Sequence, residues 1–190
     1  MFLLRQPSPE IILRFIDSQK NLAFSYLQTG ATQAEPPDGF TVDHNRIRLG
    51  EGKRTYDRAV AALRSWKQFD LGWVAVFPSG LPVEAGTTVA VQAKTFGVWS
   101  LSACRIIYVI DEAKRFGFAY GTLPDHVECG EERFTVEWQV DDSVWYEIVA
   151  FSRPRHPLAK LARPLVRRWQ KQFARESLAV MLAVSSTNHQ

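Results

Sequence analysis

Between Thr88 and Phe151 the chain consists of short segments with strand-like patterns, separated by brief turns. From Arg133 to Val140 apolar residues alternate with polar ones, which predicts a strand with one buried and one solvated face. The predicted strands of this run are 88–94, 99–110, 115–121, 133–140 and 144–151. Because such turns join antiparallel neighbours, strands adjacent in the sequence are expected to be adjacent in the sheet.

Helical patterns flank this run. Ser8-Pro9-Glu10 has the form of a helix start, with a capping hydroxyl, a proline at the first helical position and an acid in the first turn. Apolar residues recur at helical spacing from Thr55 to Phe69 and again from Leu158 to Met181, which predicts an amphipathic helix and a long final helix. Shorter strands are expected over 40–44, 46–49 and 71–77.

These segments predict an α+β fold, with a curved antiparallel sheet of six or seven strands packed on a long C-terminal helix and with the helices on one face. By analogy of fold, a curled sheet holding a long helix is the START-like helix-grip architecture. A single domain is expected over residues 1–190. Its N-terminal helix and arm would occupy about 1–52, and its sheet and final helix about 53–184.

Cysteine content and hydropathy restrict the class of protein further. Cys104 and Cys129 match neither a disulfide scaffold nor a paired zinc motif, so reduced thiols are expected. The N-terminus lacks the apolar core of a signal peptide, and no apolar run approaches the roughly 18 residues of a transmembrane helix. The sequence therefore predicts a cytoplasmic protein without a transmembrane segment. It leaves the oligomeric state open.

Positive charge is concentrated near the C-terminus. The segment from Arg153 to Glu176 holds eight Lys or Arg residues against one Glu, although the net charge of the chain is only +3. Such a basic helix could bind an anionic surface or nucleic acid through its charges. No recognition motif or base-stacking platform accompanies it, so a solvated helix face is the favoured interpretation and a nucleic-acid partner is not expected.

One predicted strand has an aromatic face and a nearly bare face. Phe116, Phe118 and Tyr120 alternate with two glycines and an alanine. Side chains on a strand point alternately to its two sides, so the bare side would let a helix or a ligand approach closely.

The residues after this strand are polar and predict a loop from 122 to 132. It carries groups that could act as acid, base, nucleophile or metal ligand: Asp125, His126, Glu128, Cys129, Glu131 and Glu132. No metal site is expected, because the second ligand pair of a zinc site is missing. Cys129 also lacks an adjacent base that would activate it. Arg105 and Arg133 lie within strand patterns and are expected to pair with Glu131 and Glu132.

Several short motifs resemble, in the same order, the uncharacterised family catalogued as domain of unknown function 1990. They are Gly30-Ala31-Thr32, Gly39-Phe40, Leu49-Gly50-Glu51-Gly52, Ala62–Trp66, Cys104–Tyr108, Gly117–Pro124, Gly130–Phe134 and Ala150–Pro154. The motifs cover nearly the whole chain. The resemblance implies a single-domain protein and carries no activity, substrate, cofactor or catalytic residue. His126 and Cys129 fall between the motifs, which argues against an essential role for either.

The predicted function is binding of an apolar or amphipathic small molecule in a cavity between the sheet and the final helix, with no cofactor. The candidate ligand-binding residues are Phe116, Phe118, Tyr120, Asp125, His126, Glu131, Phe134, Trp138 and Tyr146. An enzyme of isomerase, cyclase or hydrolase type, using the loop 125–131, is the alternative. The aromatic residues could also fill the core completely and leave no cavity.

Overall fold

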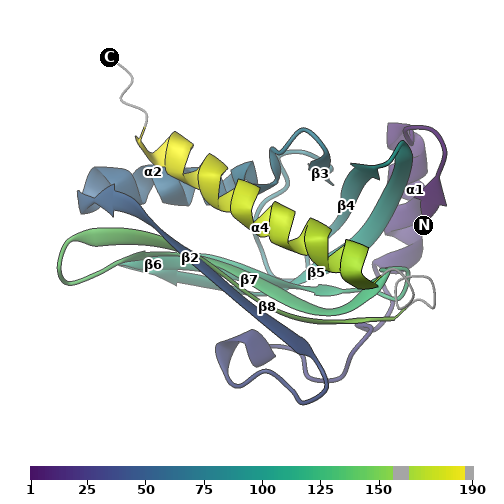
Figure 1. Ribbon diagram of the computed structural model, residues 1–190, viewed down its shortest axis with the longest axis horizontal. Helices are drawn as coiled ribbons and strands as arrows, with labels where there is room; N and C mark the ends of the chain where they lie inside the picture. Colours follow the sequence, from purple (N-terminus) through teal and green to yellow (C-terminus); the bar gives the residue numbers. More distant parts are fainter. Residues whose placement is uncertain (156–162, 187–190) are drawn as a thin grey trace.

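The computed structural model describes residues 1–155 and 163–186 (Figure 1). Its sheet has eight strands, all paired antiparallel, in the order β2-β8-β7-β6-β5-β4-β3, with β1 paired to β5. The strands are β1 Phe2–Leu3, β2 Thr41–Glu51, β3 Val74–Phe77, β4 Thr88–Thr95, β5 Val98–Glu112, β6 Arg115–Thr122, β7 Glu128–Trp138 and β8 Ser143–Pro154. The helices are α1 Pro9–Gln19, α2 Gly52–Arg64 and α4 Arg163–Ser186, with the 3-10 turns η1 Ala31–Gln33 and η2 Lys67–Phe69.

The predicted fold class is confirmed. From β3 to β8 each strand pairs with the next strand of the sequence, as short hairpin turns require. The exception is β2, which is one long strand rather than two short ones and pairs with β8 from Thr41 opposite Ser152 to Glu51 opposite Ser143. An early segment of the chain therefore completes the sheet beside its last strand.

Helices α2 and α4 cover one face of the sheet, called here the inner face (Figure 1). Ala174, Ser177 and Met181 of α4 are buried and recur every three or four residues, which places them on one side of the helix. Within this seam, the hydroxyls of Tyr146 and Ser177 lie 3.0 Å apart. Phe173 packs against the core, whereas the start of the predicted helix, from Leu158 to residue 162, lies outside the described residues.

The expectation that every helix packs on one face is wrong. Ile12 and Phe15 of α1 pack with Leu101 and Ala103 of β5, which point to the opposite side from the inner-face residue Cys104. Helix α1 therefore lies on the other side, called here the outer face. The two amphipathic helices look alike in the sequence, because a helical pattern shows that one side is buried but not which face of a sheet buries it.

The bare side of β6 also faces outward, and the N-terminal arm covers it. A Cβ atom at Gly121 would lie 2.3 Å from the hydroxyl of Tyr26 and 3.0 Å from the ring of Phe24. Only glycine allows this approach. The close neighbour expected from the sequence is thus the segment between α1 and η1, and not a helix or a ligand.

The packing of α4 predicts that truncating the smaller Met181 destabilises the protein more than truncating the larger Trp169. Met181 is completely buried, so Met181→Ala should lower the free energy of unfolding by about 2–5 kcal/mol. Trp169 is larger but only partly buried, and it borders a cavity. Trp169→Ala should therefore cost less than Met181→Ala in denaturant unfolding, and a greater cost would contradict this arrangement of α4.

Candidate functional site

A cavity of about 740 Å³ lies between the inner face of the sheet and the first half of α4. It exists because side chains on the inner face become smaller toward this end: Tyr146 and Ile148 of β8 are followed by Ala150 and Ser152. Its apolar walls are formed by Phe69, Trp73, Val74, Val91, Ile148, Val166, Trp169 and Phe173. An apolar cleft of this size is typical of small-molecule sites.

The other half of the inner face is filled. There Tyr146 occupies the space beneath α4, and Ser177 and Met181 of the helix close against the sheet. At the cavity end, Trp169 and Phe173 border the space that Ala150 leaves without filling it. A rigid helix cannot follow such a gradient in side-chain size, so the separation at its first half remains open.

A glutamate and a tyrosine form the polar part of the cavity floor. Tyr120 of β6 lies opposite Glu132 of β7, and its hydroxyl donates a 2.7 Å hydrogen bond to Glu132 Oε2. Burial raises the pKa of Glu132, the Tyr120 hydrogen bond lowers it and the negative charge of Asp43 raises it, and together they bring the pKa to about 7. Glu132 can therefore exchange a proton near neutral pH, as a general acid or base must.

Two more carboxylates border the same cavity. Burial raises the pKa of Glu128, whose Oε1 has no hydrogen-bond partner among the described residues. Asp43 of β2 is instead neutralised by Arg167 of α4, which donates two hydrogen bonds of 2.5 and 2.6 Å to its carboxylate. This bidentate pair joins the helix to the edge of the sheet beside the cavity.

Strand β7 begins at Glu128, so the predicted loop 122–132 is wrong over its second half. A run of polar residues predicts a solvated loop, but here each polar group is accommodated on one face of the sheet. Glu128 and Glu132 point inward to the cavity, and Cys129 and Glu131 point outward. Strand alternation separates these groups and prevents them from acting as one loop site.

Glu131 anchors the N-terminal arm on the outer face. Its carboxylate accepts hydrogen bonds from the Tyr26 hydroxyl at 2.9 Å, from the Gly30 amide at 2.7 Å and from the Thr32 amide at 3.0 Å. The Thr32 hydroxyl also contacts Glu131 and lies 2.6 Å from the Tyr108 hydroxyl. Glu131 also borders the cavity, but its carboxylate points away from it and bonds to these outer-face residues.

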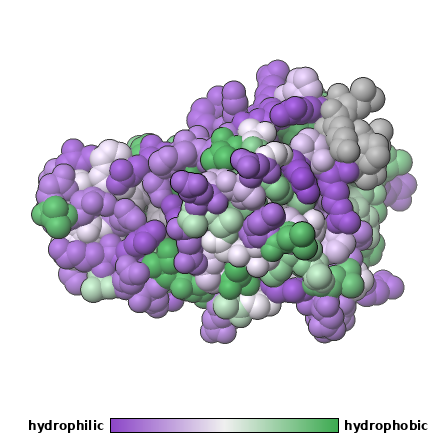
Figure 2. Space-filling view, turned by 90° about the horizontal axis from the view of Figure 1, so that it is seen from below, coloured by the Kyte–Doolittle hydropathy of each residue, from purple (hydrophilic) through white to green (hydrophobic). Residues whose placement is uncertain are grey.

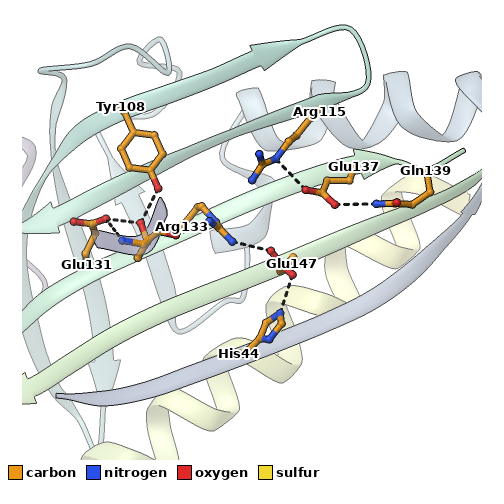
Figure 3. A network of polar contacts seen from close by, with 9 residues as sticks. His44, Tyr108, Arg115, Glu131, Arg133, Glu137, Gln139 and Glu147 are labelled. Carbon is orange, nitrogen blue, oxygen red and sulfur yellow. Dashed lines mark hydrogen bonds and ion pairs between the residues drawn. The ribbon is translucent and has the colours of Figure 1, made fainter. Parts of the chain in front are cut away.

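The two strand arginines have other partners than the predicted Glu131 and Glu132. Arg133 forms a 2.9 Å ion pair with Glu147, which in turn contacts His44 (Figure 3). Arg105 donates to the carbonyls at the end of α1, including that of Leu22 at 3.0 Å. The pairing prediction is wrong, because both arginines use partners that are distant in the sequence.

Asp125 and His126 remain in the loop between β6 and β7. Asp125 bonds to Gln19 of α1 at 3.3 Å and is exposed. His126 borders the cavity, burial lowers its pKa to about 4, and its Nδ1 accepts the Glu128 amide at 3.0 Å. The imidazole is therefore neutral near pH 7, with its proton on Nε2.

Among the aromatic candidates, Tyr120 borders the cavity. Phe116, Phe118, Phe134 and Tyr146 are fully buried in the core on the same face. Trp138 packs against Tyr56, with ring centroids 6.0 Å apart. The structure thus assembles a different constellation, centred on Glu132, which the sequence pattern places in the loop. Glu132, Phe134 and Val136 occupy alternate positions of one strand and therefore share a face, which is the signal in the sequence that Glu132 faces inward.

Within 1–155 and 163–186, no three His, Cys, Asp or Glu residues are grouped closely enough to hold a metal ion. The same part of the chain contains no helix that is long and apolar enough to cross a membrane.

The architecture and cavity define the chain as a helix-grip protein. The chain belongs to the family described as Domain of unknown function (DUF1990), whose model matches residues 25–180. A UPF0548 protein of Dictyostelium discoideum is 37% identical, with 99% of this chain and 97% of the relative covered. A UPF0548 protein of Deinococcus radiodurans is 38% identical, with 92% of this chain and 94% of the relative covered.

Solved structures show the same fold at low sequence identity. A hypothetical protein of Helicobacter pylori matches with a TM-score of 0.58 at 13% identity, covering 86% of this chain and 96% of that one. A norcoclaurine synthase point mutant from Thalictrum, in complex with a transition-state analogue, matches with a TM-score of 0.50 at 12% identity. That match covers 80% of this chain and 100% of the synthase.

Glu132 should make the stability of the protein depend on pH. Its pKa rises from an ordinary 4.5 to about 7 on folding, so its ionisation opposes folding increasingly as pH rises between these values. Glu132→Gln should therefore raise the free energy of unfolding by about 1–3 kcal/mol at pH 8 and change it little at pH 5. Denaturant unfolding at both pH values measures this, and an equal effect at both would refute the assignment.

Glu131→Gln should loosen the attachment of the N-terminal arm to the outer face of the sheet. The variant loses the charge that accepts the Gly30 and Thr32 amides, so hydrogen exchange at both amides should accelerate. The control is Glu137→Gln, on the same face of β7 but paired with Arg115. Unchanged protection of Gly30 and Thr32 in Glu131→Gln would show that the carboxylate does not hold the arm.

Proposed function

We propose that this protein binds an apolar or amphipathic small molecule in the cavity between the sheet and α4. The observation that carries the proposal is a cavity of about 740 Å³ with apolar walls and a Tyr120–Glu132 pair on its floor. Sites for small molecules combine a large apolar surface with a few placed polar groups. The norcoclaurine synthase complex shows that a protein of this fold can hold a small molecule.

One face of the molecule offers no broad apolar surface for docking (Figure 2). On the face of the molecule shown in Figure 2, apolar residues are scattered among hydrophilic ones and do not form a single broad patch. A protein that docks through an apolar surface presents a contiguous patch of several hundred Å². The cavity is the feature that combines apolar area with converging polar groups.

A second candidate is an enzyme that uses Glu132 and Tyr120 for proton transfer. The observation in its favour is the pKa of about 7 at Glu132, beside a phenol hydrogen bond in an apolar cavity. In this enzyme the acid–base group would lie on the inner face of β7, whereas the sequence predicts it in the loop 125–131. Its products would be sought by incubating the protein with any molecule that is found bound in the cavity.

Filling the cavity should abolish binding. Ala150 borders the cavity, so Ala150→Phe should occupy its volume and reduce binding of the neutral dye N-phenyl-1-naphthylamine at least about tenfold. Native mass spectrometry of freshly purified protein should show a bound small molecule in the natural chain and not in the variant.

Ala75→Phe is the matched control, because Ala75 is exposed on β3 outside the cavity. Both variants should keep the circular dichroism spectrum of the natural protein. Equal dye affinity in Ala150→Phe, Ala75→Phe and the natural chain would show that the dye does not enter this cavity. The absence of any dye binding and of any co-purifying molecule would refute the proposed function.

A further inference from the structure

Glu132 is a carboxylate in an apolar cavity without a cation beside it. Its one hydrogen bond to a side chain comes from the Tyr120 hydroxyl, and it forms no ion pair with Lys or Arg in residues 1–155 and 163–186. Removing a carboxylate from water is costly unless it is paired with a positive charge or well hydrogen-bonded. The protein leaves this requirement largely unmet.

Glu128 is a second carboxylate on the same floor, and it differs from Glu132 because arginines lie near it. The residue is only 7% exposed and its Oε1 has no hydrogen-bond partner among the described residues, but Ser152, Gln170 and the charges of Arg167 and Arg163 offset part of the effect of burial on its pKa. Glu128 and Glu132 share the inner face of β7, with Gly130 between them, so their Cα atoms are about 13 Å apart by the rise of a strand. A single charged nitrogen therefore meets one of the two groups, and Glu132 is the one that lacks a neighbouring arginine.

The neighbouring charges do not neutralise Glu132. Asp43 on β2 is a nearby negative charge and raises the pKa of Glu132. Arg167 on α4 is a nearby positive charge, but it donates two hydrogen bonds to Asp43 and forms no ion pair with Glu132. Lys171 borders the cavity but is exposed to solvent. His126 is neutral, and Tyr146 and Cys104, which face Glu132 from β8 and β5, are held in their protonated forms by burial.

The opposite wall suits an organic cation with an apolar body. Phe69, Trp73, Trp169 and Phe173 border the cavity from η2, from the residue before β3 and from α4. Aromatic rings bind apolar groups and also attract a nearby cation through their electron-rich faces. At the Glu132 end of the cavity, an unpaired carboxylate on the floor and aromatic rings on the wall favour a positively charged ligand over an anionic one.

We propose that the ligand of this cavity is an alkylamine with an apolar or aromatic body, whose protonated nitrogen binds Glu132. This inference rests on the proposed function and names the class of its ligand. The amine supplies the cation that the chain itself omits beside Glu132. Its apolar body replaces water against the aromatic wall.

The experiment compares three probes with the same biphenylbutyl body that end in an amine, an alcohol or a carboxylate. Isothermal titration calorimetry at pH 8 should show that the amine binds at least about tenfold more tightly than the alcohol, which is the scale of a hydrogen bond to a charged group. The carboxylate probe should bind most weakly. At pH 6 the preference for the amine should shrink, because Glu132 becomes protonated below a pKa of about 7.

Glu132→Gln should make the amine and the alcohol bind equally and should remove the pH dependence. Glu137→Gln is the control, since that glutamate lies on the outer face of β7 in an ion pair with Arg115. Equal binding of amine and alcohol by the natural chain would overturn the inference and leave the proposed function standing. Tightest binding of the carboxylate probe would do the same, whereas failure of all three probes and of the neutral dye would refute both.

Discussion

The alternation of side chains along β7 is the constraint on which both halves of this structure depend. β7 has paired neighbours on both sides, so Glu131 is buried beneath the arm and Glu132 is partly buried at the border of the cavity. The outward carboxylate accepts hydrogen bonds from two hydroxyls and two backbone amides of the arm. The inward carboxylate, that of Glu132, accepts a hydrogen bond from the phenol of Tyr120. Two adjacent residues of one type thus acquire a structural role and a candidate functional role.

The electrostatics of the cavity are costly for folding and therefore informative. Burial that raises the pKa of Glu132 to about 7 opposes its ionisation, and an ion pair would have relieved this cost. The same chain provides such relief to Asp43 through Arg167 and to Glu147 through Arg133. Groups left in unfavourable surroundings within a pocket are candidates for contact with a ligand, because binding can then supply the missing partner.

Local patterns in the sequence are sufficient to predict the elements and their class. Alternating residues predict most strands within a few positions, and helical spacing predicts the final helix, because both periodicities reflect one buried side. The motifs from Gly30 to Pro154 indicate the correct family. Glu132 is two residues before the apolar Phe134, so strand alternation already predicts that it faces inward. The surrounding run of polar residues predicts a loop instead and obscures this signal.

Only the tertiary structure decided which face each element covers and which distant groups meet. Helix α1 and the arm pack outside, β2 pairs with β8, and Arg133 binds Glu147 instead of an adjacent glutamate. The cavity itself depends on the size of side chains from β2 to β8 and from α4, which no single segment specifies. Periodicity is a local property of the chain, whereas burial, charge pairing and empty volume arise between segments far apart in sequence, and for that reason the site required the fold.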